Sequence, residues 1–250
     1  MKLSGLQKVT LLDFPGKLAC TIFTCGCNFR CPFCHNEDLV WHAAQAPEYP
    51  IDQVLSYLKE RSGYLEGVCI TGGEPLVQKE EDMVSFIETI KNLGLLVKLD
   101  TNGTNPVTLK KLIDNKLIDM VAMDIKTSVE KYPILAGLGA DGYGKTALNL
   151  DQANMKKLLD NVLESVSIIK ENKIQYEFRT TVIKPLHQKE DFEGIGKIIE
   201  GAENYFIQSY RHASEEAAPT DIFSAYNKEE LEMFADIVKK YVKNANVRGI

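Results

Sequence analysis

Short apolar runs alternate with longer amphipathic stretches along most of the chain. The runs LACTIFT, GVCIT and LLVKLD, at residues 18–24, 67–71 and 95–100, have the length and composition of buried strands. Further strands are predicted at 118–125, 174–182 and 204–210, and helices at 51–61, 80–94, 106–115, 151–172, 189–201 and 228–243. Strand and helix alternate at least five times. This pattern indicates an α/β fold with βαβ units and a parallel sheet.

The chain is predicted to open with an antiparallel hairpin. The segment VTLLD precedes the strand at 18–24, and the turn Phe14-Pro15-Gly16-Lys17 lies between them. Proline followed by glycine at the two central positions is typical of a type II turn.

The segments that follow the predicted strands are rich in polar, small or cysteine residues. They read TCGCNFRCPFCHN, TGGEP, DTNGT, DIKTS, RTTVIKP and QSYRHAS. In parallel α/β folds, functional residues gather at the C-terminal ends of the strands. Six such segments in succession predict that they line the rim of one site.

Composition and charge exclude several classes of protein. The 250 residues are 44% hydrophobic and 26% charged, as in a soluble globular domain. No apolar run reaches the roughly 18–20 residues of a membrane helix, and residues 1–17 lack an export signal core. The expected location is therefore the cytoplasm, with no membrane partner. A net charge of -6 with scattered basic residues argues against a nucleic-acid partner.

Cysteine clustering is the clearest chemical signal. Cys27, Cys31 and Cys34 are spaced C-x3-C-x2-C, and Cys25 lies just upstream. A structural zinc site needs four ligands; Cys25 could be the fourth, whereas His35 directly follows Cys34 and is poorly placed. An iron–sulfur cluster held by only three thiolates would keep one iron open for another ligand. Zinc, a cluster and, less favoured, a thiol redox site all remain open at this point.

Several motifs together carry a family resemblance. The three-cysteine motif, with Phe33 before its last cysteine, and the GGEP at 72–75 resemble the radical S-adenosylmethionine (SAM) superfamily. The strings GCNFRCPFCHN, LDTNG and MDIK resemble the activating enzymes of glycyl radical enzymes. The opening GLQKVTLLDFPGKLACTIFTCGCNFRCPFCHN is most similar to activators of anaerobic ribonucleoside-triphosphate reductase. The resemblance covers roughly residues 4–210.

The resemblance implies a fold and a reaction. The fold would be one domain over 1–250, a partial (β/α)6 TIM-like barrel with its core at about 18–210 and a helical extension at about 211–250. A [4Fe-4S] cluster, reduced by a flavodoxin- or ferredoxin-type donor, would cleave SAM. The resulting 5'-deoxyadenosyl radical would remove a hydrogen atom from a glycine of a partner enzyme. The sequence has no further CxxCxxC motif, so one cluster is expected.

The resemblance also implies roles for individual residues. Cys27, Cys31 and Cys34 would hold three irons, and the SAM contacts would come from Phe33, Gly72, Gly73, Glu74 and Lys126, with Arg179 and Gln208 touching SAM or substrate. A monovalent cation would bind Asp100, Thr101, Asp124 and the Ala122 carbonyl. Two structural alternatives remain: Asp100 could cap a helix or form an Asx turn, and Asp124 could form an ion pair with Lys126.

Three further expectations concern the rest of the chain. Residues 127–150, with four glycines, are the best candidate for a mobile loop that covers the site, and their GYGK lacks the rest of a phosphate-loop pattern. His187 and His212 are expected at the surface, and Cys20 and Cys69 inside strands as small buried hydrophobic residues. Two other functions remain open: a radical SAM enzyme with a small-molecule or other protein substrate, and a zinc-binding interaction protein.

Overall fold

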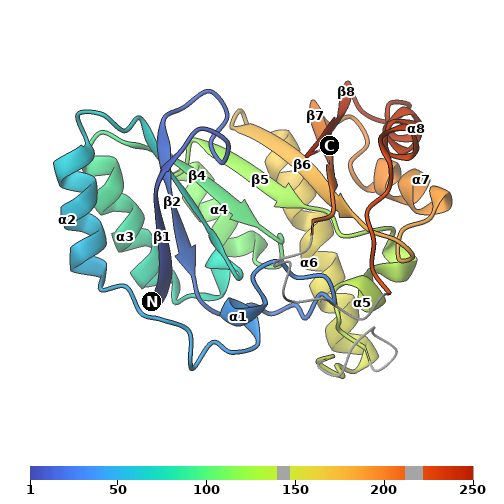
Figure 1. Ribbon diagram of the computed structural model, residues 1–250, viewed down its shortest axis with the longest axis horizontal. Helices are drawn as coiled ribbons and strands as arrows, with labels where there is room; N and C mark the ends of the chain where they lie inside the picture. Colours follow the sequence, from blue (N-terminus) through green and yellow to red (C-terminus); the bar gives the residue numbers. More distant parts are fainter. Residues whose placement is uncertain (140–146, 212–221, 250) are drawn as a thin grey trace. The chain divides into compact units, whose positions relative to one another are not determined.

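The computed structural model describes residues 1–139, 147–211 and 222–249 (Figure 1). The chain divides into two compact units. Unit 1 comprises Met1–Asn28, Asn36–Ala122 and Glu171–Gln175, and unit 2 comprises Phe29–His35, Met123–Lys170 and Tyr176–Ile250.

Unit 1 is built on a hairpin followed by parallel strands. Its strands are β1 (Leu3–Thr10), β2 (Ala19–Thr24), β3 (Gly67–Gly72) and β4 (Leu96–Thr101), and its helices are α1 (Glu37–Val40), α2 (Ile51–Arg61), η1 (Pro75–Val77), α3 (Glu80–Asn92) and α4 (Pro106–Asp114). β1 pairs antiparallel with β2, whereas β2, β3 and β4 pair in parallel and in chain order. The predicted strands and helices of this part of the chain are therefore confirmed.

The opening turn has the predicted geometry. The Lys17 amide donates to the Phe14 carbonyl at 3.1 Å, and Gly16 has a φ of 72°. A positive φ at the third position is what a type II turn requires and what glycine adopts without a steric cost.

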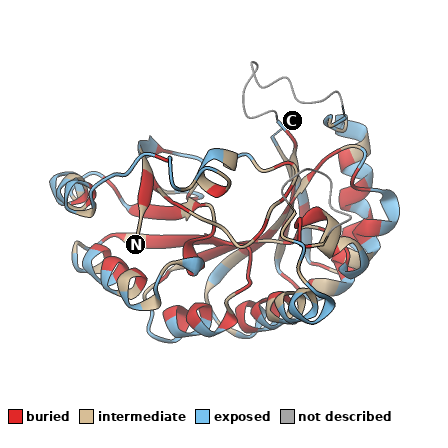
Figure 2. Cartoon of the chain, turned by 90° about the horizontal axis from the view of Figure 1, so that it is seen from below, coloured by how far each residue is buried: buried red, intermediate tan, exposed pale blue. Residues whose placement is uncertain are grey.

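Helix α3 shows how the amphipathic pattern builds the core of unit 1. Met83, Phe86, Ile87 and Ile90 are buried, while the acidic first turn is more exposed. Figure 2 shows the same division on the helices, which bury one face and expose the other. Burial of apolar side chains at helical spacing is what attaches such a helix to a sheet.

Unit 2 continues the alternation. Its elements are η2 (Val129–Lys131), α5 (Tyr132–Leu135), α6 (Gln152–Glu171), β6 (Gln175–Val182), α7 (Lys189–Ile198), β7 (Asn204–Ser209), α8 (Lys228–Val238) and β8 (Asn244–Arg248). The last residue of α6 and the first residue of β6 belong to unit 1. The boundary between the units falls within β5 (Met120–Asp124), after Ala122. β6, β7 and β8 pair in parallel and in chain order. β8 forms where the sequence suggested only a short tail after the last helix.

The segment at 127–150 is folded in much of its described part. Tyr132, Leu135 and Leu138 are each 1% exposed. The Arg30 amide donates to the Ala136 carbonyl at 2.8 Å, which ties the segment to the cysteine-bearing residues of unit 2. The expected mobile loop is therefore wrong for residues 127–139, which are folded and bury Tyr132, Leu135 and Leu138. Residues 140–146, and with them the GYGK glycines, lie outside the described residues.

Across the three described stretches of the chain, no helix is long and apolar enough to span a membrane.

Candidate functional site

The candidate site residues are distributed over both units. Unit 1 holds Cys27, Gly72, Gly73, Glu74, Asp100, Thr101 and Ala122, and unit 2 holds Cys31, Phe33, Cys34, Asp124, Lys126, Arg179 and Gln208.

Cys25, which could have completed a zinc site, is engaged elsewhere in unit 1. Its buried thiol lies 3.4 Å from the backbone carbonyl oxygens of both Leu39 and Ala43, and its single S–H donates to this pair of acceptors. A thiol whose S–H is directed to backbone carbonyls is engaged as a hydrogen-bond donor within the fold. The structure therefore assigns Cys25 to holding residues 39–43 against the end of β2.

Cys27 faces an amide network in unit 1. The Asn102 side-chain Nδ2 lies 3.9 Å from the Cys27 sulfur and donates to the Asn28 side-chain Oδ1 at 2.9 Å. The Asn28 side-chain Nδ2 in turn donates to the Thr104 hydroxyl at 2.7 Å, and that hydroxyl donates to the Asn102 side-chain Oδ1 at 2.7 Å. An N–H group aimed at sulfur stabilises a thiolate. Sequence analysis missed Asn102 as a candidate, although it belongs to the DTNG string.

The two glycines of GGEP bring two backbones into close contact. The Gly73 amide donates to the Thr24 carbonyl at 3.0 Å, and the Glu74 amide donates to the Gly26 carbonyl at 2.8 Å. A Cβ at Gly73 would lie 2.0 Å from the Gly26 oxygen, and one at Gly72, where φ is 121°, would lie 2.3 Å from the Thr24 oxygen. The glycines are thus required by the close approach of this backbone to that of Thr24 at the end of β2 and of Gly26 in the cysteine loop.

Glu74 joins the ends of β3 and β4. It is 1% exposed, and its carboxylate accepts hydrogen bonds from the Leu76 amide at 3.0 Å, the Thr101 hydroxyl at 2.8 Å and the Asn102 amide at 2.6 Å. A buried carboxylate requires such donors because its desolvation is costly. The structure therefore gives Glu74 a positioning role, while its predicted contact with SAM stays a prediction.

Asp100 is paired with a buried lysine. Lys98, 1% exposed, forms an ion pair with the Asp100 carboxylate. Asp100 does not cap helix α4, because the cap is Asn105, whose side chain accepts from the Thr108 amide at 3.1 Å. The helix-cap alternative for Asp100 is thus wrong, and the ion pair replaces it.

Asp124 in unit 2 lies between two basic side chains. Its carboxylate is 2.9 Å from the Lys126 ammonium and 2.5 Å from the Arg179 Nε. Burial alone would raise the pKa of Asp124, but the charges of Arg179 and Lys126 outweigh it and hold that pKa well below its usual range. Burial alone would lower the pKa of Lys126, but the Asp124 charge holds it above its usual range. The ion-pair alternative for Asp124 and Lys126 is therefore present in the structure.

Cys31 is a buried thiol beside this ion pair. Burial raises the pKa of Cys31 to about 11, against the attraction of the Lys126 charge. Without a metal the side chain is thus protonated at neutral pH, and a metal must displace the proton to bind. In unit 1 the Asn102 amide lies near the Cys27 sulfur, and in unit 2 the Lys126 ammonium lies near Cys31. Three cysteine thiols at this spacing are the type of donor that iron–sulfur clusters use. Within either unit, the described residues contain no group of three His, Cys, Asp or Glu side chains placed to hold a metal ion.

His187 is buried, and the expected surface position is wrong. It is 0% exposed, its Nδ1 accepts from the Ile183 amide at 3.3 Å, and its Nε2 lies 2.8 Å from the Lys126 carbonyl oxygen. Burial lowers the pKa of His187, so the ring is neutral and its Nε2–H donates. Its ring also meets that of Phe33 edge-on, with centroids 6.2 Å apart. His187 therefore fixes the backbone of Lys126, while His212 lies outside the described residues.

Gln208 lies on β7 in unit 2. It is paired in register with Thr181 of β6 and Arg248 of β8, and it is half-buried. Its predicted contact with SAM or substrate stays a prediction.

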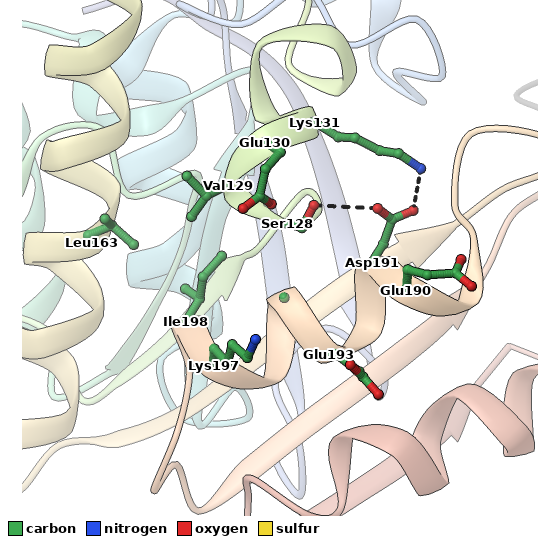
Figure 3. Close-up of a pocket in the computed structure, with 11 residues that line it drawn as sticks. Ser128, Val129, Glu130, Lys131, Leu163, Glu190, Asp191, Glu193, Lys197 and Ile198 are labelled. Atoms are coloured by element: carbon green, nitrogen blue, oxygen red, sulfur yellow. Dashed lines mark hydrogen bonds and ion pairs between the residues drawn. The ribbon is translucent and has the colours of Figure 1, made fainter.

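Unit 2 also contains a cavity of about 580 Å³ (Figure 3). It is lined by residues of η2, α6 and α7, and Asp191 at its edge accepts from Lys131 at 2.7 Å and from Ser128 at 3.4 Å. No predicted site residue lines it. The cavity is therefore separate from the candidate site residues.

Comparison with known proteins agrees with the motifs. The model of the Radical SAM superfamily matches residues 21–200. A protein of Methanocaldococcus jannaschii named as a glycyl-radical enzyme activating enzyme is 30% identical over 99% of this chain and 95% of its own. The pyruvate formate-lyase-activating enzyme of Clostridium pasteurianum is 25% identical over 77% of this chain and 80% of its own.

Solved structures support the fold. A structure of TYW1 with a lysine–pyruvate adduct bound has a TM-score of 0.59 at 16% identity and covers 90% of this chain and 74% of that one. A structure of anSMEcpe with bound AdoMet has a TM-score of 0.59 at 18% identity and covers 90% of this chain and 61% of that one. At such low identity these likenesses show the fold alone. Together with the superfamily match over residues 21–200, they confirm the predicted α/β fold class of the radical SAM type.

Proposed function

Since this chain belongs to the radical SAM superfamily, we propose that it is an activating enzyme that generates a glycyl radical on a partner enzyme, specifically an anaerobic ribonucleoside-triphosphate reductase. The observation that carries the proposal is the similarity to a glycyl-radical enzyme activating enzyme over nearly the whole length of both chains. The chain is a radical SAM enzyme similar to activating enzymes, and the choice of partner rests on its opening segment.

The proposed cofactors are a [4Fe-4S] cluster and SAM, which the family implies. When bound, the cluster supplies the electron that breaks a carbon–sulfur bond of SAM. Cys27, Cys31 and Cys34 would hold the cluster, and Asn102 would donate toward the Cys27 sulfur. Hydrogen bonds to cluster sulfurs are one of the means by which a protein sets the reduction potential.

The remaining residues would position SAM. Lys126, fixed by Asp124 through its ammonium and by His187 through its carbonyl, would bind the SAM carboxylate. Glu74 would act mainly by holding Thr101 and Asn102 in place. We propose the same SAM- or substrate-binding roles for Phe33, Arg179 and Gln208 as the resemblance implies.

Substitution Lys126→Ala is expected to weaken SAM binding about tenfold to a hundredfold, because a charge-assisted hydrogen bond contributes about 1.5–3 kcal/mol. Asp124 keeps its Arg179 partner, so the fold and the iron content should be preserved. Isothermal titration of the reconstituted protein with its cluster kept oxidised, so that SAM is bound but not cleaved, measures the affinity. Lys131→Ala, which removes another lysine of unit 2 that is paired with a carboxylate, is the control. Unchanged SAM affinity in Lys126→Ala would refute the role.

The proposed activity predicts a glycyl radical on the partner. The reconstituted enzyme, SAM and a reduced flavodoxin- or ferredoxin-type donor should produce a glycine-centred EPR doublet on anaerobic ribonucleoside-triphosphate reductase. Pyruvate formate-lyase and a reductase variant with alanine at the radical glycine are the controls. A doublet on pyruvate formate-lyase alone would reassign the partner. SAM cleavage without a radical on either enzyme would favour the alternative, a radical SAM enzyme with a small-molecule or different protein substrate.

A further inference from the structure

A fully buried lysine lies on β4 of unit 1 and belongs to no motif. Lys98 is 1% exposed and sits between Val97 and Leu99, both 0% exposed. An ammonium group that is removed from water loses several kcal/mol of hydration unless a charged partner compensates. A buried lysine therefore requires a specific reason.

The surroundings of Lys98 identify its partner. Lys98 and Asp100 are two residues apart on one strand, so their side chains leave the same face of the sheet, and they form an ion pair. The parallel register pairs Lys98 with Cys69 of β3, and the Lys98 ammonium lies 3.8 Å from the Cys69 sulfur. The ammonium is thus held by one carboxylate and one soft sulfur, at a defined position.

This arrangement conflicts with the monovalent-cation site that the resemblance implies. Of the four predicted ligands, only Asp100 and Asp124 carry charge. In unit 1 the charge of Asp100 is balanced by Lys98, and in unit 2 that of Asp124 is balanced by Lys126 and Arg179. A hard cation binds through oxygen atoms, and carboxylates are the ligands that balance its charge. A free ion would have to compete at Asp100 with an ammonium that the chain itself supplies.

We propose that the Lys98 ammonium takes the place of the monovalent cation. It is a positive charge on a side chain of β4, and it balances the negative charge of the Asp100 carboxylate. Lys98 is then a positioning residue for the SAM site, and this chain binds SAM without a requirement for potassium or sodium ions. The part of the proposal that concerns SAM rests on the proposed function. The part that concerns Asp100 and Lys98 can be tested on the protein without cofactors.

The first experiment measures thermal unfolding of the cofactor-free full chain in KCl, NaCl and tetramethylammonium chloride at equal ionic strength. The wild-type midpoint should be the same in all three salts. Lys98→Met removes the charge and keeps an unbranched side chain, so Asp100 should gain a cation site and the midpoint should rise by several degrees in KCl or NaCl relative to tetramethylammonium. Lys98→Gln, which can still donate to Asp100, is the second variant in case the first does not fold. Lys91→Met, which breaks a half-exposed ion pair with Asp119, is the matched control and should show no ion-specific shift.

The second experiment measures SAM affinity of the reconstituted protein in the same salts. The wild-type dissociation constant should vary less than twofold, whereas that of Lys98→Met should be at least tenfold lower in potassium or sodium than in tetramethylammonium. A potassium- or sodium-specific effect in the wild type, or none in both folded Lys98 variants, overturns the proposal. Failure of the wild type to bind SAM in any salt would refute the proposed function and leave the cofactor-free test of Lys98 intact.

Discussion

Replacement of Cys31 with alanine is expected to reduce cluster content and SAM cleavage to background while the protein still folds. Cys31 is one of three cysteines at the spacing of the superfamily motif, and a [4Fe-4S] cluster held by two protein thiolates would be poorly retained. The cofactor-free fold should survive because the buried Cys31 thiol is protonated there and alanine fits in its volume. Iron analysis, absorbance and release of 5'-deoxyadenosine after anaerobic reconstitution measure the effect.

Cys25→Ala is the matched control for Cys31→Ala. Its thiol donates to the carbonyls of Leu39 and Ala43, so its loss should cost about 1 kcal/mol of stability and leave the iron content unchanged. Equal loss of iron in both variants would show that Cys25 is a ligand. One zinc and no iron in the reconstituted wild type would restore the zinc-binding interaction protein as the better description.

Hydrophobic periodicity predicted most of the fold. Strands β2, β3, β4 and β5 are buried along nearly their whole length, as is typical of parallel strands that are covered on both faces. β8 was missed because its sequence, NANVR, has no apolar run, and its pairing with β7 depends on long-range contacts. His187 was placed at the surface because its burial depends on two backbone partners, Lys126 and Ile183, that are distant or unremarkable in sequence.

The candidate site was predictable as a set of motifs and not as a set of contacts. Cys27, Glu74 and Asp100 were found because motifs preserve their spacing along the chain. The contact of Asn102 with Cys27 and that of Lys98 with Cys69 were not found, because each joins segments that only the fold brings together. The Lys98–Asp100 pair is local, and its two-residue spacing on one strand is the signal that was missed. Even for GGEP, the sequence suggested that the backbone approaches a ligand. The structure adds that it approaches the backbone of Gly26.

Substitution Gly73→Ala is therefore expected to destabilise unit 1 even in the absence of any cofactor. The added Cβ would lie 2.0 Å from the Gly26 carbonyl oxygen and 2.7 Å from its carbonyl carbon, which are backbone atoms and cannot rotate away. Relief requires the backbone of residues 72–74 or of the cysteine loop to move. Overpacking of this kind costs about 3 kcal/mol. The same movement would strain the hydrogen bonds that Gly73 and Glu74 donate to Thr24 and Gly26.

Urea unfolding of the cofactor-free protein, followed by tryptophan fluorescence, measures this effect in the relevant unit, because the single tryptophan, Trp41, lies in unit 1. The midpoint of Gly73→Ala should fall clearly below that of the wild type. Gly63→Ala is the control in the same unit, since a Cβ there meets no atom within 4 Å, and its midpoint should change little. If Gly73→Ala unfolds at the wild-type midpoint and loses only SAM affinity, the glycine serves the ligand and not the backbone contact with Gly26. A lowered midpoint without cofactors instead means that GGEP shapes the cysteine loop before any cofactor binds.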